Sequence, residues 1–154
     1  MKISFMSTEA YVRSHIEHGI NTIEFFHPQS NSLPGKILEA LAREIHFAGT
    51  HDETKVILLK SGGEKTFCSG ASFDELAAIK DEKEGLVFFS GFANVINAMR
   101  KCPKCIIGRI QGKCVGGVVG IAATVDYAIA TDKAEIKLSE LAVGIDHYCG
   151  GPEV

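Results

Sequence analysis

The sequence predicts an α/β fold. Residues 11–17 and 20–26 alternate apolar and polar side chains on either side of a glycine turn, which is typical of a β-hairpin. Residues 54–60 form a continuous apolar run between polar ends, which predicts a strand buried on both faces. Residues 105–125 begin with β-branched side chains, pass through glycines and end in small apolar residues, the order expected for a strand, a tight turn and a helix. Strands and helices therefore alternate along the chain.

The composition predicts one soluble domain that spans residues 1–154. The chain is 45% hydrophobic and 23% charged, which allows a sizeable core. Sixteen Lys and Arg against nineteen Asp and Glu give a formal net charge of -3, and no basic stripe indicates nucleic acid or an anionic membrane. No apolar run reaches the ~18 residues of a membrane span, and residues 1–5 lack the apolar core of a signal peptide. We therefore expect a cytoplasmic protein that binds neither nucleic acid nor membranes.

Helical spacing of apolar side chains predicts three helices in the first two thirds of the chain. The first covers residues 33–47, with Ser32 at its N-cap. A short helix begins at Phe73. The third covers residues 85–100 and stops before Pro103, because a residue that precedes proline disfavours helical backbone.

The glycine turn at Gly116 and Gly117 is the candidate ligand site of the chain. It precedes a helix, whose first N–H groups lack partners within the helix, and glycine lets a ligand approach them closely. Val118 and Val119 follow instead of Lys and Ser or Thr, which excludes a phosphate-binding P-loop, and the glycine spacing does not fit a dinucleotide fingerprint. An oxyanion site remains, or small residues that only let a helix pack closely on a sheet. The small residues 68–72 pose the same choice between a ligand loop and a plain connection.

Cysteines and histidines do not form a pattern that predicts a metal site. Cys102 and Cys105 form a C-x-x-C pair without the second pair that a zinc site requires, and they lie between a helix and a strand rather than at a helix N-terminus. His15, His18 and His27 lie on or near the hairpin without a carboxylate or cysteine at ligand spacing. We expect no metal and no disulfide framework, and a metal or thiol module at the C-x-x-C pair is the weaker alternative.

Two short strands and a helical turn are predicted after the glycine turn. Residues 126–130 and 133–138 carry the strand patterns, and residues 139–145 predict a turn opened by Ser139. Glu140 stands beside a Leu-Ala-Val run, which would partly desolvate its carboxylate and suit it to moving protons. A solvated or capping role is the alternative.

These motifs together resemble the enoyl-CoA hydratase/isomerase (crotonase) superfamily. Residues 67–72, FCSGAS, are similar to the family's Phe-(Ser/Ala)-Ala-Gly-Ala-Asp loop. Residues 112–126 resemble its second signature, a glycine turn that opens a helix of small residues and leads to an Asp. Residues 139–145 stand where the family carries Pro-Glu, and residues 31–33, NSL, where it usually has Asn-Ala-Leu. The resemblance runs in unbroken order from about residue 10 to residue 145.

The resemblance implies a crotonase-like ββα spiral of the ClpP/crotonase fold, of which this chain holds the N-terminal core without the C-terminal helices. It implies an enzyme whose substrate is a coenzyme A thioester and which needs no cofactor. The backbone N–H groups of Ala71 and Gly117 would form an oxyanion hole for the thioester oxygen. Residues 67–71 would also contact the adenine end of CoA through backbone atoms. The residues implied to bind acyl-CoA are Phe67, Cys68, Ser69, Gly70, Ala71, Gly116 and Gly117.

The chain departs from the family pattern at the proton-transfer positions. Gly120 stands where hydratases carry the first of two glutamates, whereas Glu140 keeps the second. One glutamate there resembles the enoyl-CoA isomerases, and adding water is easier with two carboxylates. We therefore expect Glu140 alone to move protons, in hydration of an enoyl-CoA or in migration of its double bond. The alternative is an acyl-CoA-binding protein with lost or altered catalysis. Other departures are Ser72, Val118 and Ser139 in place of the usual Asp, Gly and Pro.

Length is the second departure from the family. Full-length members carry C-terminal helices that close the CoA pocket and build homotrimers, often paired into hexamers. Residues 146–154 do not resemble the usual continuation, so the sequence is either incomplete or that of a remnant. Without those helices we expect a large exposed apolar patch, and with it association or poor solubility.

Overall fold

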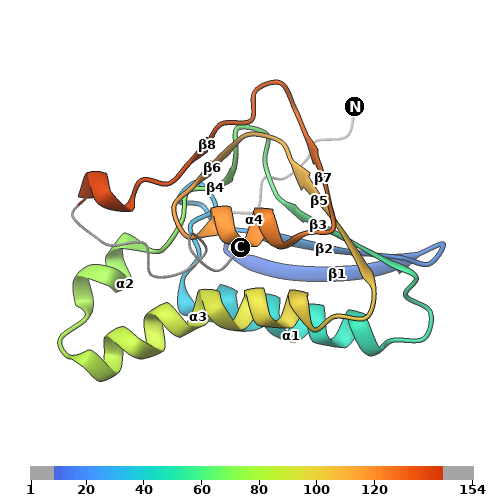
Figure 1. The fold of residues 1–154 in the computed structure, drawn as a ribbon, viewed down its shortest axis with the longest axis horizontal. Helices are drawn as coiled ribbons and strands as arrows, with labels where there is room; N and C mark the ends of the chain where they lie inside the picture. The colour runs from blue at the N-terminus through green and yellow to red at the C-terminus, as the bar shows by residue number, and fades with distance from the viewer. Residues whose placement is uncertain (1–8, 144–154) are drawn as a thin grey trace.

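The computed structural model describes residues 9–143, which form two β-sheets and the helices packed on them (Figure 1). The larger sheet has the strand order β1-β2-β3-β5-β7, with bounds Tyr11–Glu17, Ile20–Phe26, Val56–Ser61, Cys105–Ile110 and Tyr127–Ala130. The smaller sheet has the order β4-β6-β8, with bounds Thr66–Cys68, Lys113–Val115 and Ile136–Lys137. The helices are α1 Gly35–Thr50, α2 Phe73–Ala78, α3 Glu82–Arg100, α4 Val118–Thr124 and the 3-10 turn η1 Glu140–Val143.

The chain winds as a spiral in which each turn adds one strand to each sheet. β3, β5 and β7 lie in the larger sheet, and β4, β6 and β8 follow them in the smaller one. Helical segments follow each pair, so the repeating unit is ββα. All strand pairs are parallel except the β1–β2 hairpin, which turns through His18 (φ 52°) and Gly19 (φ 83°). The predicted α/β class and the predicted hairpin are confirmed.

Helices α1 and α3 lie side by side under one face of the larger sheet (Figure 1). The face that they cover carries the fully buried side chains of the strands, and α4 packs against α3 and β6. The buried apolar core includes Ile23, Phe25, Leu38, Leu41, Ile45, Ile57, Leu59, Phe92, Val95, Ile96, Met99 and Ile106. No helix between residues 9 and 143 is both long and apolar enough to cross a bilayer.

The predicted burial of β3 on both faces is wrong. Ile57 and Leu59 are buried, whereas Val56, Leu58 and Lys60 on the other face are only half-buried. The reason is that α1 and α3 cover a single face of the sheet, so its outer face stays open. A continuous apolar run does not reveal how many helical layers will cover it.

Helix boundaries differ from the sequence prediction where capping decides them. Ser32 does not cap α1; its N-cap is Pro34, and the N–H of Gly35 donates to Glu75 Oε2 at 2.8 Å. α3 begins three residues before the predicted start, because Asp81 accepts a hydrogen bond from the Glu84 N–H at 2.8 Å.

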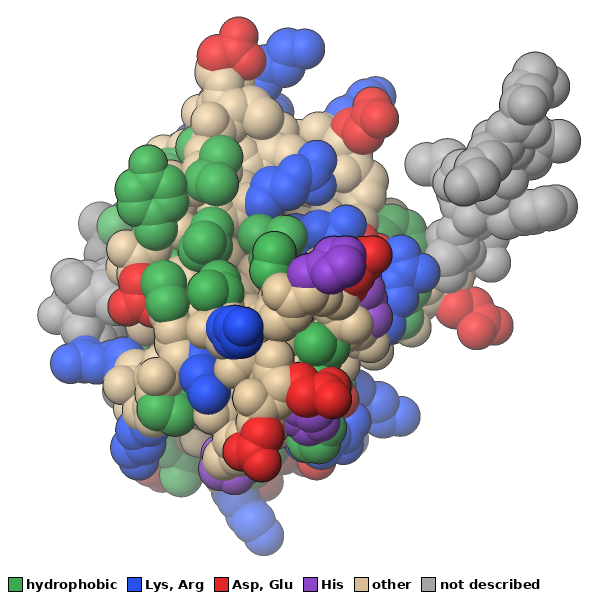
Figure 2. Space-filling view, turned by 90° about the vertical axis from the view of Figure 1, so that its right-hand side faces the viewer, with side chains coloured by type: hydrophobic (Ala, Val, Ile, Leu, Met, Phe, Trp, Pro, Cys, Tyr) green, Lys and Arg blue, Asp and Glu red, His purple; other side chains and the backbone are tan. Residues whose placement is uncertain are grey.

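Apolar side chains gather in the upper part of the outer face that Figure 2 shows. Register places Leu58, Ile107 and Tyr127 in one row across β3, β5 and β7, and Ile129 in the next row. Tyr127 and Ile129 are more than half exposed. Exposed apolar surface of this kind favours association.

On the same face, the buried carboxylate of Glu24 forms ion pairs with side chains of the two neighbouring strands. Glu24 on β2 is bonded by Arg13 and Lys60, each at 2.5 Å, and by the Tyr11 hydroxyl at 2.6 Å. Burial acts to raise the pKa of Glu24, but the hydrogen bonds from Lys60 and Tyr11 and the two cationic charges outweigh it, so the pKa lies below its ordinary value. Burial and the neighbouring Glu24 raise the pKa of Tyr11 to about 12.

Replacing Glu24 with Gln is expected to lower the free energy of unfolding at neutral pH by about 2 kcal/mol, because the amide keeps the shape but loses the charge. The folded-state pKa is depressed, so the contribution of the carboxylate is complete above its ordinary pKa of 4.5 and is lost as the pH falls through the lower folded value. Urea unfolding of both proteins from about pH 7 down to about pH 3 should show their stabilities converge. A difference that stays constant over this range would contradict the assignment.

Candidate active site

Two backbone loops meet at one edge of the smaller sheet. β4 and β6 are parallel neighbours, with Cys68 opposite Cys114, so the segments that follow them leave the sheet at the same end. A Cβ built on Gly70, where φ is 97°, would lie 2.8 Å from the Val115 carbonyl oxygen and 3.9 Å from Gly116 Cα. Only glycine allows this contact between the two loops.

The direction of the Ala71 N–H is set by the carbonyl of the same peptide unit. The Gly70 carbonyl accepts a hydrogen bond from the Leu33 N–H at 2.8 Å. Because C=O and N–H point in opposite directions across a trans peptide, the Ala71 N–H points away from Leu33. Within residues 9–143 it donates to no acceptor.

The Gly117 N–H is oriented in the same manner from the other loop. The Gly116 carbonyl accepts a hydrogen bond from the Val119 N–H at 2.8 Å at the start of α4, so the Gly117 N–H points away from that helix. It also has no acceptor in the described part of the chain. Each loop therefore offers one fixed N–H group that is free to bind a ligand.

Glu140 lies beside the glycine turn. The Gly116 N–H donates to the Lys137 carbonyl at 2.9 Å, which brings the end of β8 alongside the turn. Glu140 is half-buried and is the first residue of η1. Its Oε1 lies 3.6 Å from the position that a Cβ on Gly116 would occupy. The structure thus brings Gly70, Gly116 and Glu140 together.

Two other residues that the resemblance implied for acyl-CoA binding, Phe67 and Cys68, are packed in the protein core. The Phe67 side chain is fully buried and packs edge-on against Phe25, with ring centroids 5.5 Å apart. The Cys68 thiol is also buried and accepts a hydrogen bond from the Gly70 N–H at 3.4 Å. Burial raises the pKa of Cys68, and it raises the pKa of Cys114 to about 11, so neither thiol is a nucleophile near neutral pH. The side chains of Phe67 and Cys68 are therefore closed to a ligand, because both residues are fully buried.

The position of the first family glutamate carries no acid in this fold. Gly120 is a buried residue of α4, and none of the seven residues of that helix is ionisable. Ser72, in place of the usual Asp, accepts a hydrogen bond from the Glu75 N–H at 3.4 Å and caps α2.

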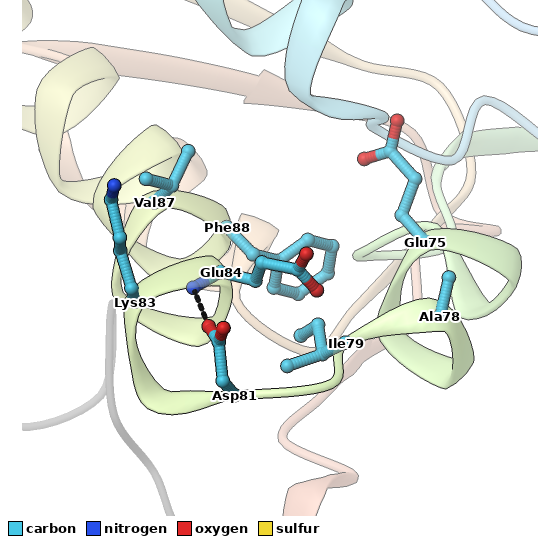
Figure 3. Close-up of a pocket in the computed structure, with 8 residues that line it drawn as sticks. All are labelled: Glu75, Ala78, Ile79, Asp81, Lys83, Glu84, Val87 and Phe88. Atoms are coloured by element: carbon cyan, nitrogen blue, oxygen red, sulfur yellow. Dashed lines mark hydrogen bonds between the residues drawn. The ribbon is translucent and has the colours of Figure 1, made fainter.

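A hollow of about 480 Å³ lies between α2 and the first turns of α3 (Figure 3). Its wall contains three carboxylates and one lysine beside an apolar part, and the lining residues are Glu75, Ala78, Ile79, Asp81, Lys83, Glu84, Val87 and Phe88. Two of the carboxylates also accept hydrogen bonds from backbone N–H groups. Asp81 accepts one from the Glu84 N–H, and Glu84 accepts one from the Lys80 N–H at 2.9 Å. α2 begins two residues after Ala71, so the hollow adjoins the element that continues from the first loop.

The C-x-x-C pair lies apart from these two loops. Cys102 follows α3 and is half-buried against Gly49, whereas Cys105 is the exposed first residue of β5. Both are free thiols, and residues 9–143 contain no group of three or more side chains arranged to hold a metal ion.

The spiral of ββα turns, with one strand of each turn in each of two sheets, is the fold that the crotonase resemblance implied. The family described as enoyl-CoA hydratase/isomerase matches residues 15–153, and the chain belongs to this family. The resemblance and the fold predicted from it are confirmed.

Relatives of known name differ in their reactions. The chain is similar to ethylmalonyl-CoA decarboxylase of Xenopus tropicalis, with 26% identity over 139 residues that cover 90% of this chain and 46% of the relative. It is similar to trans-2-decenoyl-acyl-carrier-protein isomerase of Streptococcus mutans, with 27% identity over 140 residues, 88% of this chain and 53% of the relative. A solved enoyl-CoA hydratase from Bacillus anthracis aligns with a TM-score of 0.84 and 25% identity over 94% of this chain and 55% of that one. The chain thus spans about half the length of these proteins.

Proposed function

We propose that this chain catalyses proton transfer at the carbon next to the thioester carbonyl of an enoyl-CoA. The observation that carries the proposal is the meeting of the two loops, each with a free N–H group at Ala71 or Gly117, beside the carboxylate of Glu140. Negative charge develops on the thioester oxygen when the neighbouring carbon loses a proton, and each fixed donor there contributes roughly 10²–10³ in rate.

In the proposed reaction, Glu140 removes a proton from the carbon between the carbonyl and the double bond of a 3-enoyl thioester. The electron pair of that C–H bond moves into the carbonyl, and the resulting dienolate oxygen accepts hydrogen bonds from Ala71 and Gly117. The carboxylic acid of Glu140 then returns the same proton to the far end of the dienolate, which forms the 2-enoyl thioester. One carboxylate is enough for both steps.

Hydration of a 2-enoyl-CoA is less well served by these residues. It requires one group to activate water and a proton for the neighbouring carbon, and Gly120 supplies no second carboxylate. We therefore favour isomerase chemistry over hydratase chemistry. An acyl-CoA-binding protein without turnover is the alternative function, favoured by the same missing acid.

We place the acyl chain toward the hollow beside α2, because α2 continues directly from the Ala71 loop. Three carboxylates against one lysine give its wall a net negative charge, which repels an acyl chain that ends in a carboxylate. Val87 and Phe88 suit a short apolar chain instead. Assembly into homotrimers or hexamers, as the family resemblance implies, stays a prediction.

Incubation with short 3-enoyl-CoA and 2-enoyl-CoA esters tests the proposal. We expect double-bond migration to exceed water addition by at least about tenfold, because a single carboxylate can shuttle one proton but assists water poorly. Absorbance of the conjugated thioester reports migration, and mass spectrometry reports added water. Tight binding of these esters without either reaction would select the binding protein instead. Faster hydration than migration would overturn the preference for isomerisation.

A further inference from the structure

The segment of residues 29–33 lies along the Ala71 loop in an unusual backbone conformation. Ser30 and Asn31 have φ values of 54° and 56°, two successive left-handed residues that are not glycine. Such backbone is unfavourable for L-residues and persists only where surrounding contacts impose it, most often beside functional sites. Backbone hydrogen bonds from Asn31 to His27 and from Ser32 to Gln29 hold the turn, and one side chain adds three more bonds.

The Asn31 carboxamide, which is buried, holds three separate backbone groups. It accepts a hydrogen bond from the His27 N–H at 3.0 Å and donates to the carbonyls of Gly62 at 2.8 Å and Thr66 at 2.9 Å. Two carbonyl acceptors and one N–H donor fix which end of the amide is nitrogen. The side chain therefore ties its own segment to the end of β3 and to the start of β4.

The segment of residues 29–33 is hydrogen-bonded to the Ala71 loop at two points. The Ser69 N–H donates to the Ser30 carbonyl at 3.2 Å, and the Leu33 N–H donates to the Gly70 carbonyl at 2.8 Å. The second bond fixes the direction of the Ala71 N–H, because the Gly70 carbonyl and the Ala71 N–H belong to the same peptide unit. The Gly117 N–H, by contrast, is aimed by a backbone bond within its own turn.

We propose that Asn31 is a positioning residue for the Ala71 oxyanion donor. This inference rests on the proposed function, since it assigns Asn31 to one of the two N–H groups invoked there. Loss of the carboxamide releases the segment of residues 29–33, lets the Gly70 peptide rotate and misdirects one donor of the pair, while the Gly117 donor and Glu140 stay in place.

The variant Asn31→Gly tests this, because glycine keeps the left-handed backbone and removes only the three side-chain bonds. Butyryl-CoA labelled with ¹³C at the thioester carbonyl serves as the probe. We expect its bound ¹³C signal to lose part of the downfield shift seen with the wild type, since that shift reports hydrogen bonds to the oxygen and the Gly117 donor remains. Deuterium exchange at the neighbouring carbon should slow by roughly 10–100-fold, which is less than the rate lost when one donor is removed completely. The affinity for butyryl-CoA should change by less than about threefold.

The matched control is Ser30→Gly, which relaxes the neighbouring left-handed residue but leaves its carbonyl bond to Ser69 available. It should exchange within about twofold of the wild type. Wild-type shift and exchange rates in Asn31→Gly would overturn the inference and leave the proposed function intact. Absence of a shift with the wild type itself would overturn the proposed function and the inference with it. If Asn31→Gly does not fold, Asn31→Asp, which keeps the acceptor for His27 and loses both donors, takes its place in the same measurements.

Discussion

Replacing Glu140 with Gln is expected to slow deuterium exchange at the α-carbon of bound butyryl-CoA by roughly 10²–10⁴-fold, the usual value of a positioned general base. The amide keeps the volume of the side chain beside Gly116 but cannot take up a proton. The two N–H groups are unchanged by the substitution, so the ¹³C shift of the bound thioester carbonyl should persist. Mass spectrometry of butyryl-CoA recovered from heavy water measures the exchange.

The matched control is Glu135→Gln, which changes a 71% exposed carboxylate that faces Lys113 at 3.7 Å. An exposed pair of this kind contributes little, so exchange should stay within about twofold of the wild type. Exchange by Glu140→Gln at the wild-type rate would exclude Glu140 as the base. A lost carbonyl shift in Glu140→Gln would instead mean that the substitution disturbs the loops.

The larger elements of the fold could be predicted because their signals are local. The hairpin follows from alternation around Gly19, and α1 and α3 follow from the helical spacing of their apolar side chains. β8, with two residues, lies within the strand predicted over residues 133–138, whereas β4 and β6 have three residues each, too few for any periodicity. These strands exist because Cys68 and Cys114, far apart in sequence, pair across the sheet.

Side-chain exposure was predicted less well than helix and strand type. Phe47 and Leu86 fit helical stripes, yet they are 50% and 69% exposed. A stripe gives the angular spacing of apolar residues on a helix, but the neighbouring elements decide which part of it is covered. The same reason accounts for the open face of β3.

The candidate site residues came from motifs, and the structure supplied their spatial relation. Ala71, Gly117 and Glu140 lie on three segments whose contact depends on the pairing of β4, β6 and β8. The role inferred for Asn31 could not be predicted, because its partners at Gly62 and Thr66 are more than thirty residues away. The sequence marks Asn31 only as part of NSL, which stands at the place of a family motif.

The substitution Gly112→Ala is expected to produce the largest loss of stability among these variants. A Cβ on Gly112 would lie 2.1 Å from the Lys65 carbonyl oxygen and 2.6 Å from its carbon, both backbone atoms that cannot rotate aside. β4 must therefore move away from β6, at a cost of about 3 kcal/mol or more. For a chain of this size that corresponds to a fall in Tm of roughly 6–12 °C.

The comparison variant Gly63→Ala separates this clash from ordinary glycine conformation. Gly63 lies two residues before Lys65, has a φ of 76° and has open space around its Cβ position, so the cost should be only that of left-handed backbone, about 1 kcal/mol. Because displacement of β4 also displaces Gly70 and Ala71, Gly112→Ala should lose the carbonyl shift of bound butyryl-CoA at temperatures where it is still folded, and Gly63→Ala should keep it. Equal Tm values for the two variants would show that β4 and β6 do not approach each other at Gly112 as described. A stable Gly112→Ala protein without the shift would link the loop geometry, rather than overall stability, to the binding of the thioester oxygen.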